Sequence, residues 1–528
     1  MRLDVIVVGA GFAGLYMLHR ARGLGLAAHV FESAGGVGGT WYWNRYPGAR
    51  CDVESLEYSY QFDERLQQEW RWSERFAAQP EILRYANHVA DRFGLRSEIR
   101  LDARVVAARF DEATRRWTVR TAQGEEASAQ YLVMATGCLS MPNRRCLPGL
   151  EDFAGAVYHT GEWPHEKVDF RGLRVGVIGT GSSAVQSIPL IAREAKELVV
   201  FQRTATYSVP ARNAPLDPQY EARVKADYAG FRARNSLMPN AFGSNFPRNE
   251  ASALDATPDA RRRAFEARWR HGGLFFLGAF GDLILDARAN ETAAEFVREK
   301  IRATVRDPAL AERLAPRQRI GCKRLCLDTG YYETFNRANV HLVEAAEAPV
   351  EAVTRAGVRA GGREFALDAL VLATGFDAMT GALARIDIRG RGGRALAEAW
   401  KDGPRNYLGL AVAGFPNLFT ITGPGSPSVL TNMMVSIEQH VNWIADCIAH
   451  LRARGLATIE AHAQAQDDWV AHVNAVADRT VYPLCNSWYL GANVPGKPRV
   501  FMPLLGFPAY ARKCEEVVAR GYEGFALA

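Results

Sequence analysis

The chain has 528 residues, of which 48% are hydrophobic and 23% charged, a balance typical of a globular protein with a large core. The formal net charge of +6 is small and no Lys/Arg run points to a nucleic-acid partner, while no apolar run reaches the roughly 18 residues of a membrane-spanning helix. The eight cysteines lack zinc-site spacing, which favours free thiols in a reducing cytoplasm.

Residues 3–32 predict a nucleotide-binding unit. An apolar strand at 3–8 enters Gly9-Ala-Gly11-Phe-Ala-Gly14, a helix is expected to end near residue 23, and a second strand at 28–31 ends at Glu32. The glycines let backbone N–H groups approach a pyrophosphate, and the acid accepts bonds from ribose hydroxyls. At the N-terminus, the expected ligand is FAD. A strand beginning at Leu3 leaves no room for a signal peptide, and abundant Ala, Arg and Gly suggest a bacterial source.

Residues 38–149 connect this first nucleotide-binding unit to a second one. Residues 38–52 are rich in glycine and aromatics, which by itself predicts a rigid packed loop. Alternating residues at 103–110 and 116–121 predict a hairpin. A strand at 131–135 ends in Ala-Thr-Gly, which recurs at 373–375, and we interpret the two copies as the crossings between one nucleotide domain and a second domain inserted into it. Residues 141–149 have the composition of a linker.

A second fingerprint follows the strand predicted at 173–178, as Gly179-Thr-Gly181-Ser182-Ser183-Ala184. After the next strand, at 197–201, Arg203 and Thr204 stand where the first unit has an acid. An arginine there can bind a 2′-phosphate bidentately, which favours NADPH over NADH. The alternative is an exposed arginine at a strand end.

The remaining elements are less specific. Residues 207–318 predict helices, including 258–271 and 291–305, and could form an interaction surface or a cap. Lys323-Arg324 lies between Cys322 and Cys326, which we expect to be packed thiols rather than a pair or a metal site. A strand into a Gly/Pro loop at 417–428, a helix at 435–450 and a polar-aromatic loop at 486–497 complete the chain.

Two spaced patterns carry a family resemblance. Phe153, Gly155, His159, Trp163 and Pro164 form F-x-G-x-x-x-H-x-x-x-W-P, and residues 38–52 fit G-G-x-W-x(4)-Y-P-G-x(3)-D. Both resemble signatures of the type I Baeyer–Villiger monooxygenases, and the chain looks closest to the phenylacetone and cyclohexanone monooxygenase group. The resemblance implies an enzyme that uses FAD, NADPH and O₂ to convert ketones to esters or lactones through a C4a-peroxide of the flavin, with sulfoxidation as a side activity.

The resemblance and the fingerprints together assign site residues. Arg324 is expected to stabilise the peroxide and the later oxyanion, because a guanidinium stays cationic, and Asp52 to orient it. His159 is expected to organise domain rotation or NADPH placement without a chemical role. The expected FAD residues are Gly9, Gly11, Gly14, Glu32, Gly39, Trp41 and Asp52; the NADPH residues are Gly179, Gly181, Ser182, Ser183, Arg203, Thr204, Lys323 and Trp488; the substrate-pocket residues are Ser428, Val429 and Leu430.

The predicted fold is α/β, with two Rossmann-like three-layer domains and a helical insert. We expect the FAD domain at 1–140 and 374–528, the NADP domain at 150–206 and 319–373, and the insert at 207–318. A cytoplasmic monomer is expected. Three alternatives stay open: an N- or S-hydroxylating flavin monooxygenase, a pyridine nucleotide–disulfide reductase, which would need a cysteine pair beside the flavin, and a non-catalytic flavin-binding protein.

Overall fold

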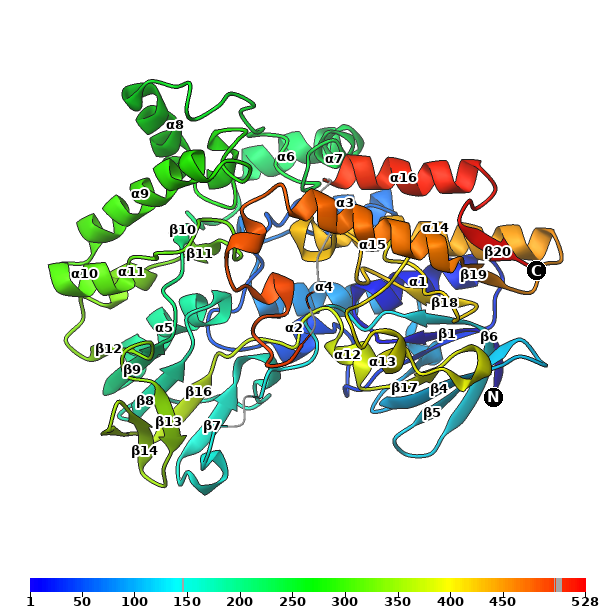
Figure 1. Cartoon of the computed structure of the whole chain (residues 1–528), viewed down its shortest axis with the longest axis horizontal. Coiled ribbons are helices and arrows are strands. Elements are labelled where there is room, and N and C mark those ends of the chain that lie inside the picture. The colour runs from blue at the N-terminus through cyan, green and yellow to red at the C-terminus, as the bar shows by residue number, and fades with distance from the viewer. Residues whose placement is uncertain (145–146, 498, 500–505) are drawn as a thin grey trace.

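A computed structural model describes residues 1–144, 147–497, 499 and 506–528, and Figure 1 shows two sheets side by side. Residues 145–146 of the predicted 141–149 linker lie outside the described residues, as do residues 498 and 500–505, which follow the predicted 486–497 loop. In the described chain, the larger sheet has eight strands in the order β17-β4-β5-β6-β1-β2-β3, with β18 also paired to β6. Its strands are β1 (Arg2–Val8), β2 (Ala28–Phe31), β3 (Ile99–Arg100), β4 (Val105–Asp111), β5 (Arg116–Thr121), β6 (Glu126–Met134), β17 (Asp387–Arg389) and β18 (Leu418–Thr420).

The centre of this sheet confirms the predicted strands. Val5, Ile6 and Val7 are fully buried, because β1 pairs in parallel with β2 on one side and β6 on the other and is covered on both faces. The expected hairpin is β4–β5, an antiparallel pair. Helix α1 (Phe12–Gly23) packs against α14 (Met433–Ala453), and both lie over the β1–β6 sheet in Figure 1.

The second sheet is parallel throughout, in the order β12-β9-β8-β16-β7. Its strands are β7 (Ala156–His159), β8 (Arg174–Ile178), β9 (Glu197–Gln202), β12 (Val340–Glu344) and β16 (Ala369–Leu372). Val200 packs in the same core as α5 (Ser182–Glu194), while Phe201 packs against Phe365 of a small antiparallel sheet, β13 (Val350–Val353), β14 (Gly357–Ala360) and β15 (Arg363–Ala366). Adjacent side chains of β9 thus face opposite layers, as strand geometry requires.

The two Ala-Thr-Gly copies occupy equivalent places in the two sheets. Gly9 has φ +106°, and a Cβ there would lie 2.5 Å from the carbonyl oxygen of Ala135. Gly179 has φ +114°, and its Cβ would lie 2.4 Å from the carbonyl oxygen of Ala373. The first position of each fingerprint therefore has to be a glycine, because the end of the neighbouring strand leaves no room for a side chain there.

The segments that follow these copies run side by side. The amide of Asn143 donates to the carbonyl of Gly375, and the amide of Asp377 donates to the carbonyl of Met141, both at 2.8 Å. The two connections between the sheets are therefore paired with each other.

Residues 207–318 are mainly helical and form the green group at the upper left of Figure 1. The helices are α6 (Pro218–Ala226), α7 (Tyr228–Ser236), α8 (Pro258–His271), α9 (Ala287–Thr304) and α10 (Pro308–Leu314). Helix α8 has the predicted bounds, whereas α9 begins four residues before the expected 291, because the Asp286 side chain accepts bonds from the amides of Arg288 and Ala289. Strand β10 (Ser208–Pro210) pairs with β11 (Cys326–Asp328) and joins this group to the Arg324 segment.

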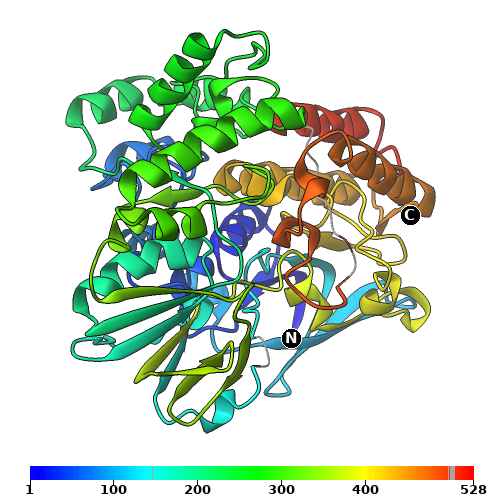
Figure 2. The same cartoon turned by 60° about the vertical axis from the view of Figure 1, so that its left-hand side comes forward.

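The C-terminal part returns to the larger sheet. Helix α14 begins at Met433, two residues before the expected 435, with Asn432 as its cap, and Ser428–Leu430 forms a separate 3₁₀ turn before it. After α15 (Ala463–Ala477), the orange segment with the turns Tyr482–Leu484 and Trp488–Leu490 lies between the two sheets in both views (Figures 1 and 2). Among the described residues, no helix is long and apolar enough to cross a membrane.

Short elements complete the fold. They are α2 (Thr40–Trp43), α3 (Glu64–Glu69), α4 (Gln79–Arg92), α11 (Tyr331–Thr334), α12 (Gly381–Ala384), α13 (Leu396–Ala399), β19 (Ile459–Ala461), α16 (Phe507–Ala519) and β20 (Phe525–Leu527).

Candidate active site

Arg324 and Asp52 form a bidentate ion pair across 272 positions of sequence. Arg324 Nε donates to Asp52 Oδ2 and Nη2 donates to Oδ1, both at 2.7 Å, and Nη1 donates to the carbonyl of Val429 at 2.7 Å. The two side chains are 23% and 22% exposed. Burial alone would lower the pKa of Arg324, but the Asp52 carboxylate raises the pKa above its ordinary value. The guanidinium is thus a fixed positive charge.

Tyr489 is a further partner of Arg324 that the sequence analysis did not name. Its hydroxyl accepts a hydrogen bond from the guanidinium, and its ring packs 4.4 Å from Trp488 and 5.7 Å from Tyr482, measured between centroids. Burial raises the pKa of Tyr489 despite the nearby cation, so its hydroxyl stays protonated. The only sequence signal was its place beside Trp488 in the polar-aromatic loop.

Arg203 and Lys323, the two cationic residues predicted to bind a 2′-phosphate, lie near each other. Lys323 is half-buried, and its pKa is lowered first by burial and then by the charge of Arg203. Arg203 is exposed at the end of β9, and in the described part of the chain neither cation forms an ion pair. The hydroxyl of Thr180 donates to the carbonyl of Thr204 at 2.8 Å and fixes the turn beside them. Two unneutralised cations at one strand end suit an anionic ligand.

The first fingerprint turn is crowded in the way that glycine permits. A Cβ on Gly14 would lie 1.8 Å from the carbonyl oxygen of Gly9, and one on Gly39 would lie 2.9 Å from the Cα of Gly11. Residues 38–41 therefore lie directly on the turn. Glu32 is 5% exposed, and its carboxylate accepts from the amide of Ala10 at 2.6 Å. These residues fit a dinucleotide, because glycines form the turn between β1 and α1 and the acid stands at the end of β2.

The aromatic wall of this turn is also fixed. Trp41 is buried, and its indole Nε1 donates to the hydroxyl of Tyr58 at 3.1 Å.

The second fingerprint turn leaves space. No atom lies within 4 Å of a Cβ placed on Gly181, and Ser182 and Ser183 begin α5. The Ser183 hydroxyl is 3.1 Å from that of Thr160, and the Ser182 hydroxyl is 3.4 Å from the sulfur of Cys326. The turn can accept a pyrophosphate at the helix N-terminus.

The His159 pattern connects the two sheets. His159 is 7% exposed; its Nδ1 accepts from the amide of Gly161 at 3.0 Å, and its Nε2 lies 3.1 Å from the hydroxyl of Thr374. That hydroxyl donates to the carbonyl of Asn143, so Nε2 is the donor to Thr374. Burial lowers the pKa of His159, so the ring is neutral near pH 7.

The ends of the same pattern are packed. The amide of Trp163 donates to the carbonyl of Trp43 at 3.3 Å, which joins the pattern to the 38–52 segment. Phe153 is 9% exposed, Pro164 follows Trp163, and a Cβ on Gly155 would lie 2.3 Å from the carbonyl oxygen of Asp368.

The three expected pocket residues lie beside Arg324. Ser428 is fully buried with φ +47°, and Val429, 6% exposed, presents its carbonyl to Arg324. Val429 and the partly buried Leu430 belong to one apolar cluster with Met379 and Tyr489.

Cys322 is not the free packed thiol that was expected. It forms a disulfide with Cys485, 163 positions away, with a Cα–Cα distance of 6.3 Å. The expectation failed because local spacing offered Cys326 as the only neighbour, whereas chain folding brings Cys485 to the site. Cys326 is a buried free thiol, as are Cys51, Cys138, Cys447 and Cys514, and Cys146 lies outside the described residues.

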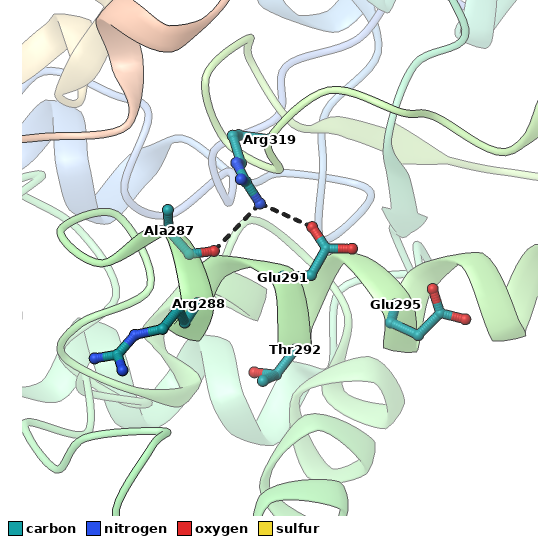
Figure 3. Close-up of a pocket in the computed structure, with 6 residues that line it drawn as sticks. All are labelled: Ala287, Arg288, Glu291, Thr292, Glu295 and Arg319. Carbon is teal, nitrogen blue, oxygen red and sulfur yellow. Dashed lines mark hydrogen bonds and ion pairs between the residues drawn. The ribbon is translucent and has the colours of Figure 1, made fainter.

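A surface hollow of about 480 Å³ lies elsewhere, on α9 (Figure 3). Its lining is mostly charged, and Arg319 Nη1 contacts Glu291 Oε2 at 2.9 Å and the carbonyl of Ala287 at 3.3 Å. None of the predicted site residues lines it.

Known proteins of similar sequence match the chain over nearly its whole length. The family described as pyridine nucleotide-disulphide oxidoreductase matches residues 6–234. An acetone monooxygenase (methyl acetate-forming) of Gordonia sp. (strain TY-5) is 43% identical over 99% of both chains. A Baeyer-Villiger monooxygenase of Pseudooceanicola batsensis is 43% identical over 98% of this chain and 95% of its own. A phenazine N-monooxygenase of Lysobacter antibioticus is 41% identical over 99% and 97%.

Solved structures of known proteins have the same fold as this chain. An oxidized steroid monooxygenase bound to NADP matches with a TM-score of 0.95 and 53% identity, covering 100% of this chain and 99% of its own. A complex of OTEMO with FAD and NADP matches with a TM-score of 0.96 and 39% identity over the same shares.

Proposed function

Because the chain belongs to the Baeyer–Villiger monooxygenases, we propose that Arg324 and Asp52 form its reacting centre, between an FAD site on the larger sheet and an NADPH site on the smaller one. The enzyme uses NADPH and O₂ to convert a ketone to an ester or lactone. FAD would supply the redox chemistry, by which one oxygen atom of O₂ is inserted between the carbonyl carbon and a neighbouring carbon, with NADPH as the reductant. The protein residues bind, orient and shield the reactants.

The first fingerprint residues Gly9, Gly11, Gly14 and Glu32 would hold FAD. The crowding of Gly14 against Gly9 and the placement of Glu32 at the turn support this assignment. The segment from Gly39 through Trp41 to Asp52 would lie along the flavin, because it rests on the fingerprint turn at one end and reaches Arg324 at the other.

NADPH would be held at three places. Gly179, Gly181, Ser182 and Ser183 would bind the pyrophosphate, since the turn is open above Gly181. Arg203, Thr204 and Lys323 would bind the 2′-phosphate, which the proximity of the two cations supports. Trp488 would contact the cofactor from the 486–497 loop, which lies between the sheets.

The single observation that carries the chemical proposal is the fixation of Arg324. A guanidinium has five N–H donors. Asp52 takes two and the carbonyl of Val429 takes one, so with Tyr489 bonded at least one remains for a substrate oxygen. A cation held in place before the reaction stabilises negative charge that develops on the carbonyl oxygen without reorganising. Ser428, Val429 and Leu430 would form the wall against which the ketone lies.

The domain division follows the two sheets. We propose FAD-domain segments 1–140 and 374–528, NADP-domain segments 150–206 and 319–373, and a helical insert at 207–318. The paired connections at 141–143 and 375–377 support two crossings at these places. We further propose a monomeric, cytoplasmic, bacterial enzyme; the buried free thiols support the cytoplasmic location and the bacterial relatives support the source.

A polycyclic ketone is the proposed substrate class, since identity to the steroid monooxygenase is 53% and to the acetone monooxygenase 43%. The test is aerobic turnover of the FAD-loaded protein with NADPH and a panel of a steroid ketone, phenylacetone, cyclohexanone and acetone, with mass spectrometry of the products. An ester or lactone heavier by one oxygen than the steroid ketone is expected. Preference for acetone or cyclohexanone would reject the polycyclic class.

N- or S-oxidation is the second candidate activity, and the 41% identity to a phenazine N-monooxygenase favours testing it. The same assay with a sulfide and an aromatic N-heterocycle decides it. Faster oxidation of either than of every ketone would make the Baeyer–Villiger reaction the minor activity of this chain.

A further inference from the structure

A disulfide connects the Arg324 segment to the base of the late loop, residues 486–497. Cys322 lies two positions before Arg324 and is fully buried, and Cys485 is half-buried directly before the loop. Their Cα atoms are 6.3 Å apart, within the span of a disulfide. The bond therefore joins two parts of the site that are far apart in sequence.

The far end of the late loop has polar anchors. The side-chain amide of Asn493 donates to the carbonyl of Phe376 at 2.7 Å, and Lys497 Nζ contacts Asp377 Oδ1 at 2.5 Å. Both anchors lie on the second connection between the sheets, so this end of the loop is held without any covalent bond.

The near end has one backbone anchor, at Val481, whose amide donates to the carbonyl of Ile284 at 2.9 Å. In the described chain, the hydrogen bonds made by the amides of residues 482–486 reach only Thr480 and Val481, both within the same turn. The disulfide is thus the link that ties the base of the loop to the segment carrying Arg324. Tyr489, four residues after Cys485, also packs against Val429 and Met379, so the disulfide adds to the contacts that hold its hydroxyl beside the guanidinium.

We propose that Cys322 and Cys485 form a reversible redox site: the disulfide fixes the late loop against Arg324, and the dithiol releases it. The oxidant is hydrogen peroxide and the reductant is a dithiol. The proposal rests on the proposed function in one respect, because hydrogen peroxide is what a flavin monooxygenase releases when oxygen is not transferred to substrate.

The chemistry balances with these reactants. The thiolate of Cys485, the more exposed of the two residues, attacks one oxygen of hydrogen peroxide; the O–O bond breaks, and the sulfur becomes a sulfenic acid while the other oxygen takes up a proton and leaves as water. The Cys322 sulfur then attacks the Cys485 sulfur, the S–O bond breaks, and a second water leaves. Two sulfurs lose two electrons and one peroxide gains them. A dithiol reverses the change by exchange through a mixed disulfide.

The consequence is a self-correcting cycle. With the pair reduced, the late loop must be ordered anew at each binding event, which weakens NADPH binding and leaves the reacting centre less shielded. More of the NADPH consumed then yields peroxide. That peroxide re-forms the disulfide beside the centre from which it came, and the loop is fixed again.

The first test counts thiols. Protein purified in air and denatured without reductant should titrate six thiols, two fewer than its eight cysteines, and all eight after reduction. Peptide mapping should show the Cys322 and Cys485 peptides joined. Eight thiols in the unreduced protein, or a different joined pair, would overturn the proposal.

The second test is kinetic and uses the FAD-loaded enzyme before and after dithiothreitol, with the reductant then removed. Reduction should raise the KM for NADPH and the peroxide released per NADPH by about three- to tenfold, the cost of ordering one or two loop side chains. Added hydrogen peroxide should restore both values. Cys485→Ala should behave as the reduced enzyme in every condition, whereas Cys447→Ala, a free cysteine in α14, should respond like the natural chain.

Equal KM and peroxide yield in the two redox states would reject the redox site. These readouts do not depend on ester formation. A complete absence of ester with every ketone would count against the proposed function alone.

Discussion

His159 donates from Nε2 to the hydroxyl of Thr374 at 3.1 Å, and that hydroxyl donates in turn to the carbonyl of Asn143 at 2.6 Å. His159 ends β7 of the smaller sheet, while Thr374 and Asn143 belong to the two connections between the sheets. One imidazole thus holds both connections to the strand beside them. Its lowered pKa keeps it neutral, and only the neutral tautomer can donate from Nε2 and accept at Nδ1.

His159→Leu should therefore act on domain placement. The variant is expected to bind FAD normally but to be reduced more slowly by NADPH, because the connections lose their shared hydrogen bond. Anaerobic flavin reduction in a stopped-flow instrument measures this rate. Unchanged reduction, with lost ester formation instead, would give His159 a chemical role that its position does not support.

Arg324→Ala should separate hydride transfer from oxygen transfer. NADPH should still reduce the flavin, whereas ester formation should fall by about 10²-fold or more, the usual effect of removing one oxyanion donor. Product analysis beside NADPH consumption checks this. Arg319→Ala removes an arginine of the same segment that pairs with Glu291 and should keep full ester yield.

Arg203→Ala should change the preference between cofactors. Loss of a charge-assisted contact of about 1.5–3 kcal/mol should raise the KM for NADPH about ten- to a hundredfold and leave that for NADH nearly unaltered. Arg337→Ala, an exposed arginine before β12, is the matched control. If both cofactors weaken equally, Arg203 does not recognise the 2′-phosphate.

Tyr489→Phe should loosen Arg324 without removing it. The ring stays packed on Trp488, but the hydroxyl that accepts from the guanidinium is lost. We expect less ester and more peroxide per NADPH, with the KM for NADPH changed less than about twofold because the loop itself remains in place. An altered KM with unaltered coupling would point to a role in cofactor binding instead.

Glu57→Gln should protect the protein at alkaline pH. Glu57 is 2% exposed, and burial, followed by the charge of Glu54, raises its pKa to about 8. A pKa raised in the folded state means that the stability is fully present below the unfolded value of about 4.5 and is lost as pH rises through 8. Glutamine mimics the protonated form, so the variant should unfold several degrees higher than the natural chain at pH 9.

Thermal unfolding from pH 5 to 9 measures this difference. Glu333→Gln, at an exposed position of α11, should leave the profile unchanged. Parallel profiles for the natural chain and Glu57→Gln would show that Glu57 is not the group that titrates.

Much of the fold could be predicted because its signals are local. The buried strands read as apolar runs, and the glycine turns mark where each strand meets a helix. The small sheet of β13, β14 and β15 was not predicted, since its four-residue strands carry little periodicity. The three-residue pair β10–β11 was missed for another reason: its strands lie 118 positions apart and neither has a pattern of its own.

The residues of the candidate site were likewise predictable only where the sequence carries a local signal. A spaced pattern led to Asp52 and the resemblance of the Lys323-Arg324 segment led to Arg324, and the structure brings the side chains of Asp52 and Arg324 into contact. The contacts of Tyr489 and the bond between Cys322 and Cys485 had no local signal, because each joins segments more than 160 positions apart. The roles of these residues stay predictions until the variants are measured.

The pairing of the two connections has a practical consequence for protein engineering. Since Met141 and Asn143 bond to Asp377 and Gly375, the chain leaves the larger sheet and returns to it at the same place. Residues 143–375 are therefore a cassette whose two ends meet, and it could be exchanged with the equivalent cassette of a relative by altering one short junction. The late loop would have to be exchanged together with the cassette. Cys485, directly before this loop, and Tyr489, within it, contact Cys322 and Arg324, which belong to the cassette.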